Sequence, residues 1–143
     1  MSASATAAHR RPASRATIHI RNLRLRTYIG FNPEETEKKQ DVVINIEIAY
    51  AVAESALRDH VEDALDYKVI TKQVIRHVEE GRFLLLERLV ADVLEICSAH
   101  PSIRSAAVTI EKPHALRFAD SVSLTLEYHA EQANNLRLLE KAS

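Results

Sequence analysis

A long, regular alternation of apolar and polar side chains over residues 41–52 constrains this chain more than any other feature of its sequence. Asn45 and Glu47 occupy polar positions in this run. The apolar positions are Val42, Ile44, Ile46, Ile48 and Tyr50. A period of two places all the apolar side chains on one face of an extended chain. The pattern therefore predicts a long strand with one buried face.

The preceding run, residues 17–30, predicts a partner for this strand. Two isoleucines before Asn22 occupy even positions, whereas two leucines after it occupy odd positions. One extra residue in a strand produces such a change of parity, so a β-bulge is expected near Asn22. The turn-forming pair Asn32-Pro33 then separates the two runs. Together they predict a long antiparallel hairpin.

The rest of the chain changes from helical to strand periodicity. Apolar side chains recur at helical spacing over residues 67–78, with Gly81 as the expected stop, and again over residues 86–97. Alternation returns over residues 106–110 and 122–128. The order strand, strand, helix, helix, strand, strand (ββααββ) predicts an α+β fold. In this fold, two helices cover one face of a four-stranded antiparallel sheet.

Two edges of such a sheet would be unpaired in a monomer. Long open edges pair readily with other strands, and proteins usually pair or cover them. We therefore expect a homo-oligomer whose subunits join edge to edge, in a closed barrel.

The 143 residues fit one domain. This domain is expected over residues 17–129. Residues 1–16 are rich in Ala, Ser and Arg and are interpreted as a flexible leader, and residues 130–143 as a charged tail.

Composition narrows the classes of function. A net charge of −1 gives no signal for a nucleic-acid or membrane partner. No apolar run approaches the roughly 20 residues that span a bilayer, and no apolar core of a signal peptide follows the first residues. A cytoplasmic location is therefore expected. Gly30 and Gly81 are the only glycines, which excludes a glycine-rich phosphate loop. The lone Cys97 excludes an internal disulfide, and the seven histidines lack metal-ligand spacing, so no metal site is expected.

Two charged residues interrupt the predicted apolar faces. Lys112 continues the buried row of the third long strand, where an unpaired ammonium group would be costly. It either extends past the strand end to water or acts as an acid/base group at the rim of a pocket. Glu87 shares a helix face with apolar residues, including Val90 and Leu94. It either pairs with a neighbouring arginine or anchors a ligand through two parallel N–H bonds.

Other candidates are weaker on position alone. Tyr67 begins the first predicted helix, where its ring could simply pack, stack on a flat heterocycle or relay a proton. Glu35 lies in an acidic turn and would be interpreted as solvated surface. His114 and Arg117 follow Lys112 within five residues. They form either a solvated basic loop or an anion site, since both side chains donate strongly to phosphate.

Several segments resemble the dihydroneopterin aldolase family, at the spacing of that family. They are IRNLRLRTYIG (20–30), Glu35, ALDYKVI (64–70), RFLLLERL (82–89) and IEKPHALRFADSVSLTL (110–126). The resemblance extends over residues 18–128. It implies the tunnelling fold (T-fold), in which four subunits join their sheets into a barrel. The assembly would be a tetramer or an octamer of two stacked rings, with pterin sites between subunits.

The resemblance also implies roles for residues in binding. Glu87 matches the glutamate that anchors the amino-pyrimidinone edge of the pterin, and Leu86 would add backbone contacts. Leu65 matches a position whose backbone touches the pterin. His114 and Arg117 are hypothesised to hold phosphates of the substrate.

Three further residues match catalytic positions of the family. Lys112 matches the lysine at the reaction centre, and Glu35 matches a glutamate near the hydroxyl groups of the substrate side chain. Tyr67 matches a tyrosine that borders the pterin and helps proton transfer, and it would come from the adjacent subunit. No cofactor is implied.

The blocks RLRT-x-IG and HALR-x-ADSVS most resemble the branch of the family that inverts C2' of 7,8-dihydroneopterin triphosphate. The product is dihydromonapterin triphosphate, formed by retro-aldol and aldol steps. The alternative within the family is an aldolase that releases 6-hydroxymethyl-dihydropterin and glycolaldehyde. A pterin-binding scaffold without turnover is a third hypothesis, although Lys112, Tyr67 and Glu35 are all present. A metal-dependent cyclohydrolase of related fold is a fourth, and the lone Cys97 argues against it.

Overall fold

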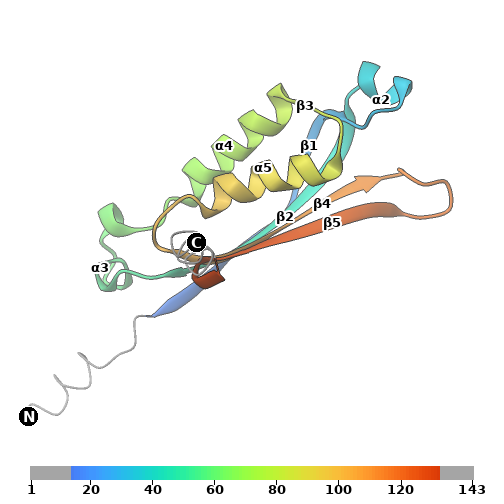
Figure 1. Ribbon diagram of the computed structural model, residues 1–143. Helices are drawn as coiled ribbons and strands as arrows, with labels where there is room; N and C mark the ends of the chain where they lie inside the picture. Colours follow the sequence, from blue (N-terminus) through green and yellow to red (C-terminus); the bar gives the residue numbers. More distant parts are fainter. Residues whose placement is uncertain (1–13, 133–143) are drawn as a thin grey trace, which may run out of the picture.

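A sheet of long strands and two long helices form two layers in the computed structural model, which describes residues 14–132 (Figure 1). The expected leader over residues 1–16 and tail over residues 130–143 lie mostly outside the described residues. Within residues 14–132, no helix is both long enough and apolar enough to cross a membrane.

The four long strands are neighbours in the order in which they occur along the chain. They are β1 (Arg15–Ile29), β2 (Gln40–Ala51), β4 (Ile103–Pro113) and β5 (Ser121–His129), and each is antiparallel to the next. All four predicted strands are therefore found, and the first two form the predicted long hairpin.

The predicted β-bulge is also found. The register of β1 against β2 changes between Ile20, which lies opposite Ile46, and Leu23, which lies opposite Ile44. Asn22 adopts a φ of 54°, a left-handed conformation that asparagine tolerates better than most residues. The extra residue directs apolar side chains on both sides of the bulge toward the helices.

The helices α4 (Tyr67–Glu80) and α5 (Leu86–Ser98) cover one face of the sheet with apolar stripes. The side chain of Asp66 caps α4 by accepting hydrogen bonds from the backbone N–H groups of Lys68 and Val69. No side chain caps α5, which follows Leu85. The buried helical residues are Ile70, Val74, Val78, Leu89, Val90, Val93 and Cys97. They pack against the alternating apolar rows of β1, β2 and β4.

Gly81 ends α4 as predicted, but not through a left-handed turn. Its φ is −95°, which any residue can adopt. The missing side chain matters instead, because a β-carbon at Gly81 would lie 2.5 Å from the ring of Phe83 and 2.9 Å from the carbonyl oxygen of His77. Glycine therefore allows the chain to turn tightly under the Phe83 ring.

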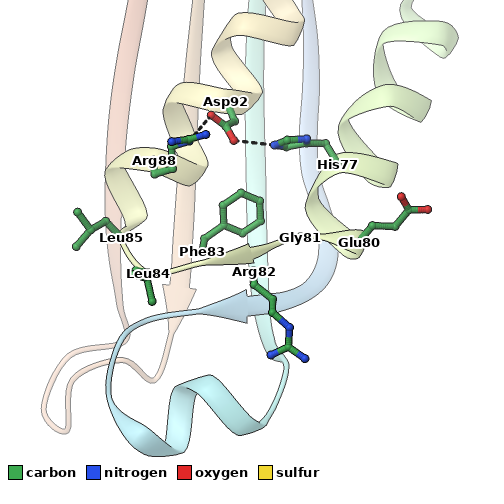
Figure 2. A pocket seen from close by; sticks show the side chains of 9 residues that line it. All are labelled: His77, Glu80, Gly81, Arg82, Phe83, Leu84, Leu85, Arg88 and Asp92. Carbon is green, nitrogen blue, oxygen red and sulfur yellow. Dashed lines mark hydrogen bonds and ion pairs between the residues drawn. The ribbon is translucent and has the colours of Figure 1, made fainter.

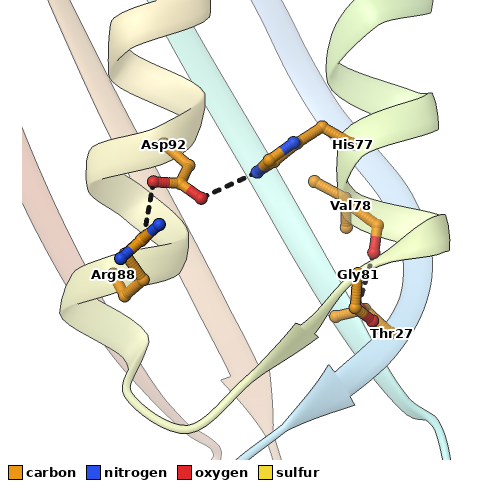
Figure 3. Close-up of polar contacts among 6 residues, drawn as sticks. All are labelled: Thr27, His77, Val78, Gly81, Arg88 and Asp92. Atoms are coloured by element: carbon orange, nitrogen blue, oxygen red, sulfur yellow. Dashed lines mark hydrogen bonds and ion pairs between the residues drawn. The ribbon is translucent and has the colours of Figure 1, made fainter.

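A buried threonine links β1 to the end of α4 (Figure 3). Thr27 is fully buried, and its Oγ1 donates a 2.6 Å hydrogen bond to the carbonyl oxygen of Val78. The last carbonyls of a helix have no partner within the helix, so this bond satisfies one of them. It also fixes the end of α4 against the sheet.

The expectation of a four-stranded antiparallel sheet is correct for the long strands but incomplete. A fifth strand, β3 (Arg82–Phe83), pairs in parallel with the end of β1, so the sheet is mixed and its order is β3-β1-β2-β4-β5. A strand of two residues has no alternation to detect, which is why the sequence did not predict it. The short helices α2 (Pro33–Glu37) and α3 (Glu54–Leu57) and a 3₁₀ turn (Val61–Asp63) also add to the predicted order.

Candidate active site

Lys112 lies inside the molecule and is paired with a carboxylate. It is part of β4, which continues to Pro113, and its side chain is 13% exposed. Its Nζ donates a 2.8 Å hydrogen bond to Oε2 of Glu35. The ammonium group is therefore held at the end of the apolar row of β4 and does not extend past the strand into water.

Glu35 belongs to α2, and its side chain is 22% exposed. Its other oxygen, Oε1, accepts a 3.3 Å hydrogen bond from the backbone N–H of Asn32. The hydrogen bond from Lys112 is the main reason why the pKa of Glu35 is lowered from its ordinary value of 4.5, although burial opposes this shift. Glu35 is therefore an ionised acceptor at neutral pH and does not lie on a solvated surface.

Gly30 leaves the space that the Glu35 carboxylate occupies, and the sequence did not indicate this role. A β-carbon at residue 30 would overlap the carboxylate atoms of Glu35. Gly30 also has a φ of +125°, which side chains rarely allow. Its N–H donates a 2.9 Å hydrogen bond to the carbonyl oxygen of Phe83 in β3. The available signal was the scarcity of glycine, since only two occur in 143 residues.

Gln40 was also missed. It begins β2, and its Nε2 donates a hydrogen bond to the carbonyl oxygen of Ile29, next to Gly30. A hydrogen bond from the Gln40 side chain also contributes to the lowered pKa of Glu35. Gln40 therefore supports both sides of the turn that holds the carboxylate.

Leu86 and Glu87 form the first turn of α5. Leu86 is partly buried against the core, whereas Glu87 is exposed. The expectation that Glu87 lies on the buried apolar face is wrong, because the buried stripe of α5 follows Leu89, Val90 and Val93 and Glu87 lies at its edge. Among the described residues, no hydrogen bond or ion pair involves the Glu87 carboxylate, so the alternative of an arginine partner is not found. Within residues 14–132, this carboxylate thus has unused capacity to accept hydrogen bonds.

These residues gather at one end of the sheet. There α2, β3, the start of α5 and the end of β4 meet (Figure 1). The carbonyl oxygen of Phe83 accepts a hydrogen bond from the N–H of Gly30, and Phe83 lies four residues before Glu87. Arg82 Nη1 donates a 3.3 Å hydrogen bond to the carbonyl oxygen of Thr36, next to Glu35. A carboxylate–ammonium pair and a free carboxylate are thus brought to the same end of the molecule.

Leu65 and Tyr67 lie at the opposite end of the helical layer. Tyr67 begins α4, and this 14-residue helix spans about 20 Å before it reaches the end that carries Glu35 and Lys112. Tyr67 is 49% exposed, and Leu65 is partly buried against the core. Tyr67 borders an open groove along the outer edge of β1. The other groove residues are Ile18, His19, Ile20, Lys68, Thr71 and Lys72. One chain alone does not bring Tyr67 to the Lys112 end.

His114 and Arg117 lie in the hairpin between β4 and β5. His114 adopts a φ of 62°, and its N–H donates a 3.1 Å hydrogen bond to the carbonyl oxygen of Asp120. The Arg117 guanidinium lies 5.4 Å from the ring centre of Phe118, and both residues are exposed. In the described part of the chain, neither His114 nor Arg117 is paired with a carboxylate.

Among residues 14–132, no three His, Cys, Asp or Glu side chains lie close enough together to hold a metal ion.

The sequence of residues 18–127 matches the protein family described as dihydroneopterin aldolase. The dihydroneopterin triphosphate 2'-epimerase of Pseudomonas aeruginosa is 51% identical over 114 residues, which cover 80% of this chain and 93% of that protein. The enzyme of the same description from Escherichia coli K12 is 50% identical over 113 residues, with 79% and 94% coverage. Both similarities thus extend over nearly the whole length of the relatives.

A solved structure has the same fold. The E. coli dihydroneopterin aldolase in complex with neopterin superposes with a TM-score of 0.73. It is 32% identical and covers 79% of this chain and 98% of that chain. The expected α+β architecture is therefore shared with a pterin-binding protein.

Proposed function

Because this chain belongs to the dihydroneopterin aldolase family, we propose that it is an epimerase acting on 7,8-dihydroneopterin triphosphate. It inverts C2' and forms dihydromonapterin triphosphate. The observation that carries this proposal is the identity of 51% and 50% to two such epimerases over more than nine-tenths of their length. Identity to an aldolase of the family is lower, at 32%.

The reaction breaks the C1'–C2' bond and forms it again. A base removes the proton of the 2'-hydroxyl, C2' becomes an aldehyde carbon, and the bonding electrons remain on C1'. The C6=N5 imine of the dihydropterin accepts these electrons as N5 is protonated, which gives an enamine. The pterin itself is therefore the electron sink. When the aldehyde turns and C1' attacks its other face, both protons return and C2' is inverted.

Lys112 and Glu35 are proposed to manage the proton of the 2'-hydroxyl. Their 2.8 Å contact places a donor and an ionised acceptor together at the rim of the site. A water molecule bound between them could accept the proton and return it, so that neither residue needs to form a covalent bond. The lowered pKa of Glu35 keeps this carboxylate able to accept hydrogen bonds at neutral pH.

Glu87 and Leu86 are proposed to hold the pterin. A carboxylate accepts two parallel hydrogen bonds well, and the N3–H and 2-amino groups of a pterin supply such a pair. The Glu87 carboxylate is exposed at the start of α5 and is not engaged by other described residues. The backbone of Leu86 would add contacts to the same edge of the ring.

Tyr67 and Leu65 are proposed to come from an adjacent subunit. Within one chain, Tyr67 is separated from the Lys112 end by the length of α4, about 20 Å. A neighbouring copy that joins its β1 edge to this sheet could bring its Tyr67 to the pterin for proton transfer at C1' or N5. The site is thus shared in a homo-oligomer, a tetramer or an octamer.

His114 and Arg117 are proposed to hold the triphosphate. They follow Lys112 within five residues, and the fragment that leaves C1' carries the phosphates. Charge-assisted hydrogen bonds would retain this fragment while the carbon–carbon bond is open, which favours re-addition over escape. Some escape would appear as aldolase side activity, with release of a glycolaldehyde-type fragment.

A chiral-product assay tests this proposal. Incubation with 7,8-dihydroneopterin triphosphate should convert the substrate into its C2' epimer, which chiral chromatography separates. Incubation with dephosphorylated 7,8-dihydroneopterin measures release of glycolaldehyde. If the second reaction is fast and no inversion of the triphosphate occurs, the protein is an aldolase and the proposal fails.

A further inference from the structure

Asp92 joins the two helices through one carboxylate (Figure 3). Its Oδ2 lies 2.7 Å from Nε2 of His77 in α4, and its Oδ1 accepts a 2.8 Å hydrogen bond from Nε of Arg88 in α5. The Asp92 side chain is only 17% exposed, less than either partner. A mostly buried carboxylate needs such partners, and bonds to charged donors are the stronger hydrogen bonds of proteins.

The bond between Asp92 and Arg88 reaches back to the first turn of α5. This end of the helix has no capping side chain, because the residue before it is Leu85. Helix ends without a capping side chain are less stable. Arg88 lies in the same first turn as Glu87, so its bond to Asp92 restrains the turn that carries the proposed pterin anchor.

A second series of contacts connects His77 with Glu35 through Phe83 and Gly30. The His77 ring lies 5.6 Å from the ring of Phe83, in a tilted contact. Phe83 in turn accepts the hydrogen bond of Gly30, the residue that makes room for the Glu35 carboxylate. Figure 2 shows Asp92, His77 and Phe83 side by side in the groove between α4, β3 and α5. The groove is thus lined by Phe83, which binds Gly30, and by Arg88, which follows Glu87.

The Arg88 guanidinium binds Asp92 and is not paired with the adjacent Glu87. Both oxygens of Asp92 are occupied, one of them by Arg88, and Glu87 has no cation partner in the described part of the chain. A released Arg88 guanidinium next to Glu87 could compete with the N–H groups of a pterin for that carboxylate.

We propose that Asp92 is a positioning residue for pterin binding, acting through Arg88 and His77 on the first turn of α5. The inference rests on the proposed function in one respect, namely that Glu87 binds the pterin. Asp92 itself touches no substrate. Its loss should weaken binding of the pterin ring and leave the chemical step nearly unchanged.

The test compares Asp92→Asn with Asp92→Glu. Asparagine keeps the shape but replaces one acceptor oxygen with an NH₂ donor, so it cannot accept from both His77 and Arg88, whereas glutamate keeps the charged acceptor. We expect Asp92→Asn to raise the Kd for neopterin, measured by calorimetry, about tenfold, which corresponds to one lost net interaction. The Asp92→Glu variant should stay within about threefold of wild type, and kcat should change less than about twofold in both. Arg88→Met removes one of the two partners of Asp92 and replaces Asp92→Asn in the test if that variant does not fold. We expect it to raise the Kd for neopterin about threefold.

Glu80→Gln provides the matched control. It removes a carboxylate that also pairs with an arginine four residues away, Arg76, but this 3.4 Å pair is well exposed and stays within α4. Exposed pairs contribute little, so its affinity for neopterin should equal that of wild type.

Three results would overturn the inference. Wild-type affinity in Asp92→Asn and Arg88→Met would show that the contact does not position the anchor. Equal losses in Asp92→Asn and Asp92→Glu, or a fall in kcat parallel to the loss of affinity, would show a structural role only. Unchanged affinity in Glu87→Ala is a separate outcome, because it refutes the anchor in the proposed function whatever Asp92 does.

Discussion

The Glu35 carboxylate occupies the space in which Gly30 would carry a β-carbon. The two residues are five positions apart, and the chain between them turns through Asn32 into α2. Since the same carboxylate binds the Lys112 ammonium group, the absence of one carbon atom allows the charged pair of the site to form.

Replacing Gly30 with Ala should therefore reduce activity more than it reduces stability. The new β-carbon displaces Glu35 from Lys112, and the positive φ adds strain of about 1–2 kcal/mol. A displacement of about 1 Å in a catalytic group can cost roughly a hundredfold in rate, so we expect a loss of at least that size in turnover of the triphosphate. Gly81→Ala is the control, because it crowds Phe83 without strain in φ and should lower the melting temperature while Glu35 keeps its place. Similar activities of the two variants would contradict this explanation.

Replacing Lys112 with Ala should remove turnover and largely preserve binding of the pterin. The ammonium group contacts Glu35 at the side-chain end of the site, whereas the ring is assigned to Glu87. Loss of a general acid/base group costs roughly 10²–10⁴ in rate. Single-turnover kinetics with the triphosphate and calorimetry with neopterin measure the two effects separately. Normal turnover would refute the assigned role.

The Glu35–Lys112 pair should make stability depend on pH on the acidic side. The pKa of Glu35 is lowered in the folded protein, so the folded state favours the ionised carboxylate more than the unfolded chain does. Its contribution to the free energy of unfolding is present above the ordinary value of 4.5 and is lost as the pH falls through the lowered pKa. Wild type should thus exceed Glu35→Gln in stability at pH 7, and the difference should shrink below about pH 4.5. Denaturant unfolding at one fixed protein concentration checks this. In the Lys112→Met background, the further change Glu35→Gln should alter stability much less at every pH.

Replacing Glu87 with Ala should weaken pterin binding without destabilising the fold. The carboxylate is exposed and forms no hydrogen bond or ion pair with other described residues, so the change in unfolding free energy should stay within about 0.5 kcal/mol. Loss of a charged acceptor for two N–H groups should raise the Kd for neopterin roughly ten- to a hundredfold. Glu95→Ala, an exposed glutamate near the other end of α5, is the matched control and should bind normally.

Periodicity predicted the elements that are long enough to show a period. The alternation over residues 41–52 predicted β2, and the change of parity at Asn22 predicted the bulge, because side-chain direction follows position in a strand. Strand β3 has two residues and thus no period, and its pairing depends on the free edge of β1 at Tyr28 and Ile29. Such an element is defined by tertiary contacts and not by its own sequence.

The candidate site was predictable in part. Lys112 was singled out because it continues an apolar row, but the row alone left open whether its ammonium group reaches water or is held at a pocket. Its partner lies 77 residues away, a pairing that no local spacing encodes, and only the family resemblance indicated Glu35. The position of Gly30 beside that carboxylate depends on tertiary contacts and could not be predicted. The exposure of Glu87 could not be predicted either, because a helical period does not distinguish the edge of a buried stripe from its centre.

Lys112 and Tyr67 should complement each other across subunits. In one chain, Tyr67 begins α4, and the length of this helix, about 20 Å, separates it from the end of the molecule that carries Lys112. If sites form between copies, the Lys112 of one chain works with the Tyr67 of the next, in a head-to-tail contact that closes into a ring. A chain that lacks one of these residues can still supply the other.

Mixing Lys112→Ala with Tyr67→Phe chains tests this arrangement. Each variant alone should be slower than wild type by roughly a hundredfold or more, since each lacks a proton-transfer group. When equal amounts are unfolded and refolded together, a site is intact if its Lys112 side comes from the tyrosine variant and its Tyr67 side from the lysine variant. Each has a chance of one half, so about one quarter of wild-type activity should return. Mixing Lys112→Ala with Glu35→Gln should restore nothing, because the same chain contributes both residues, which lie 2.8 Å apart. Equal recovery in both mixtures, or none in the first, would place Tyr67 outside a shared site.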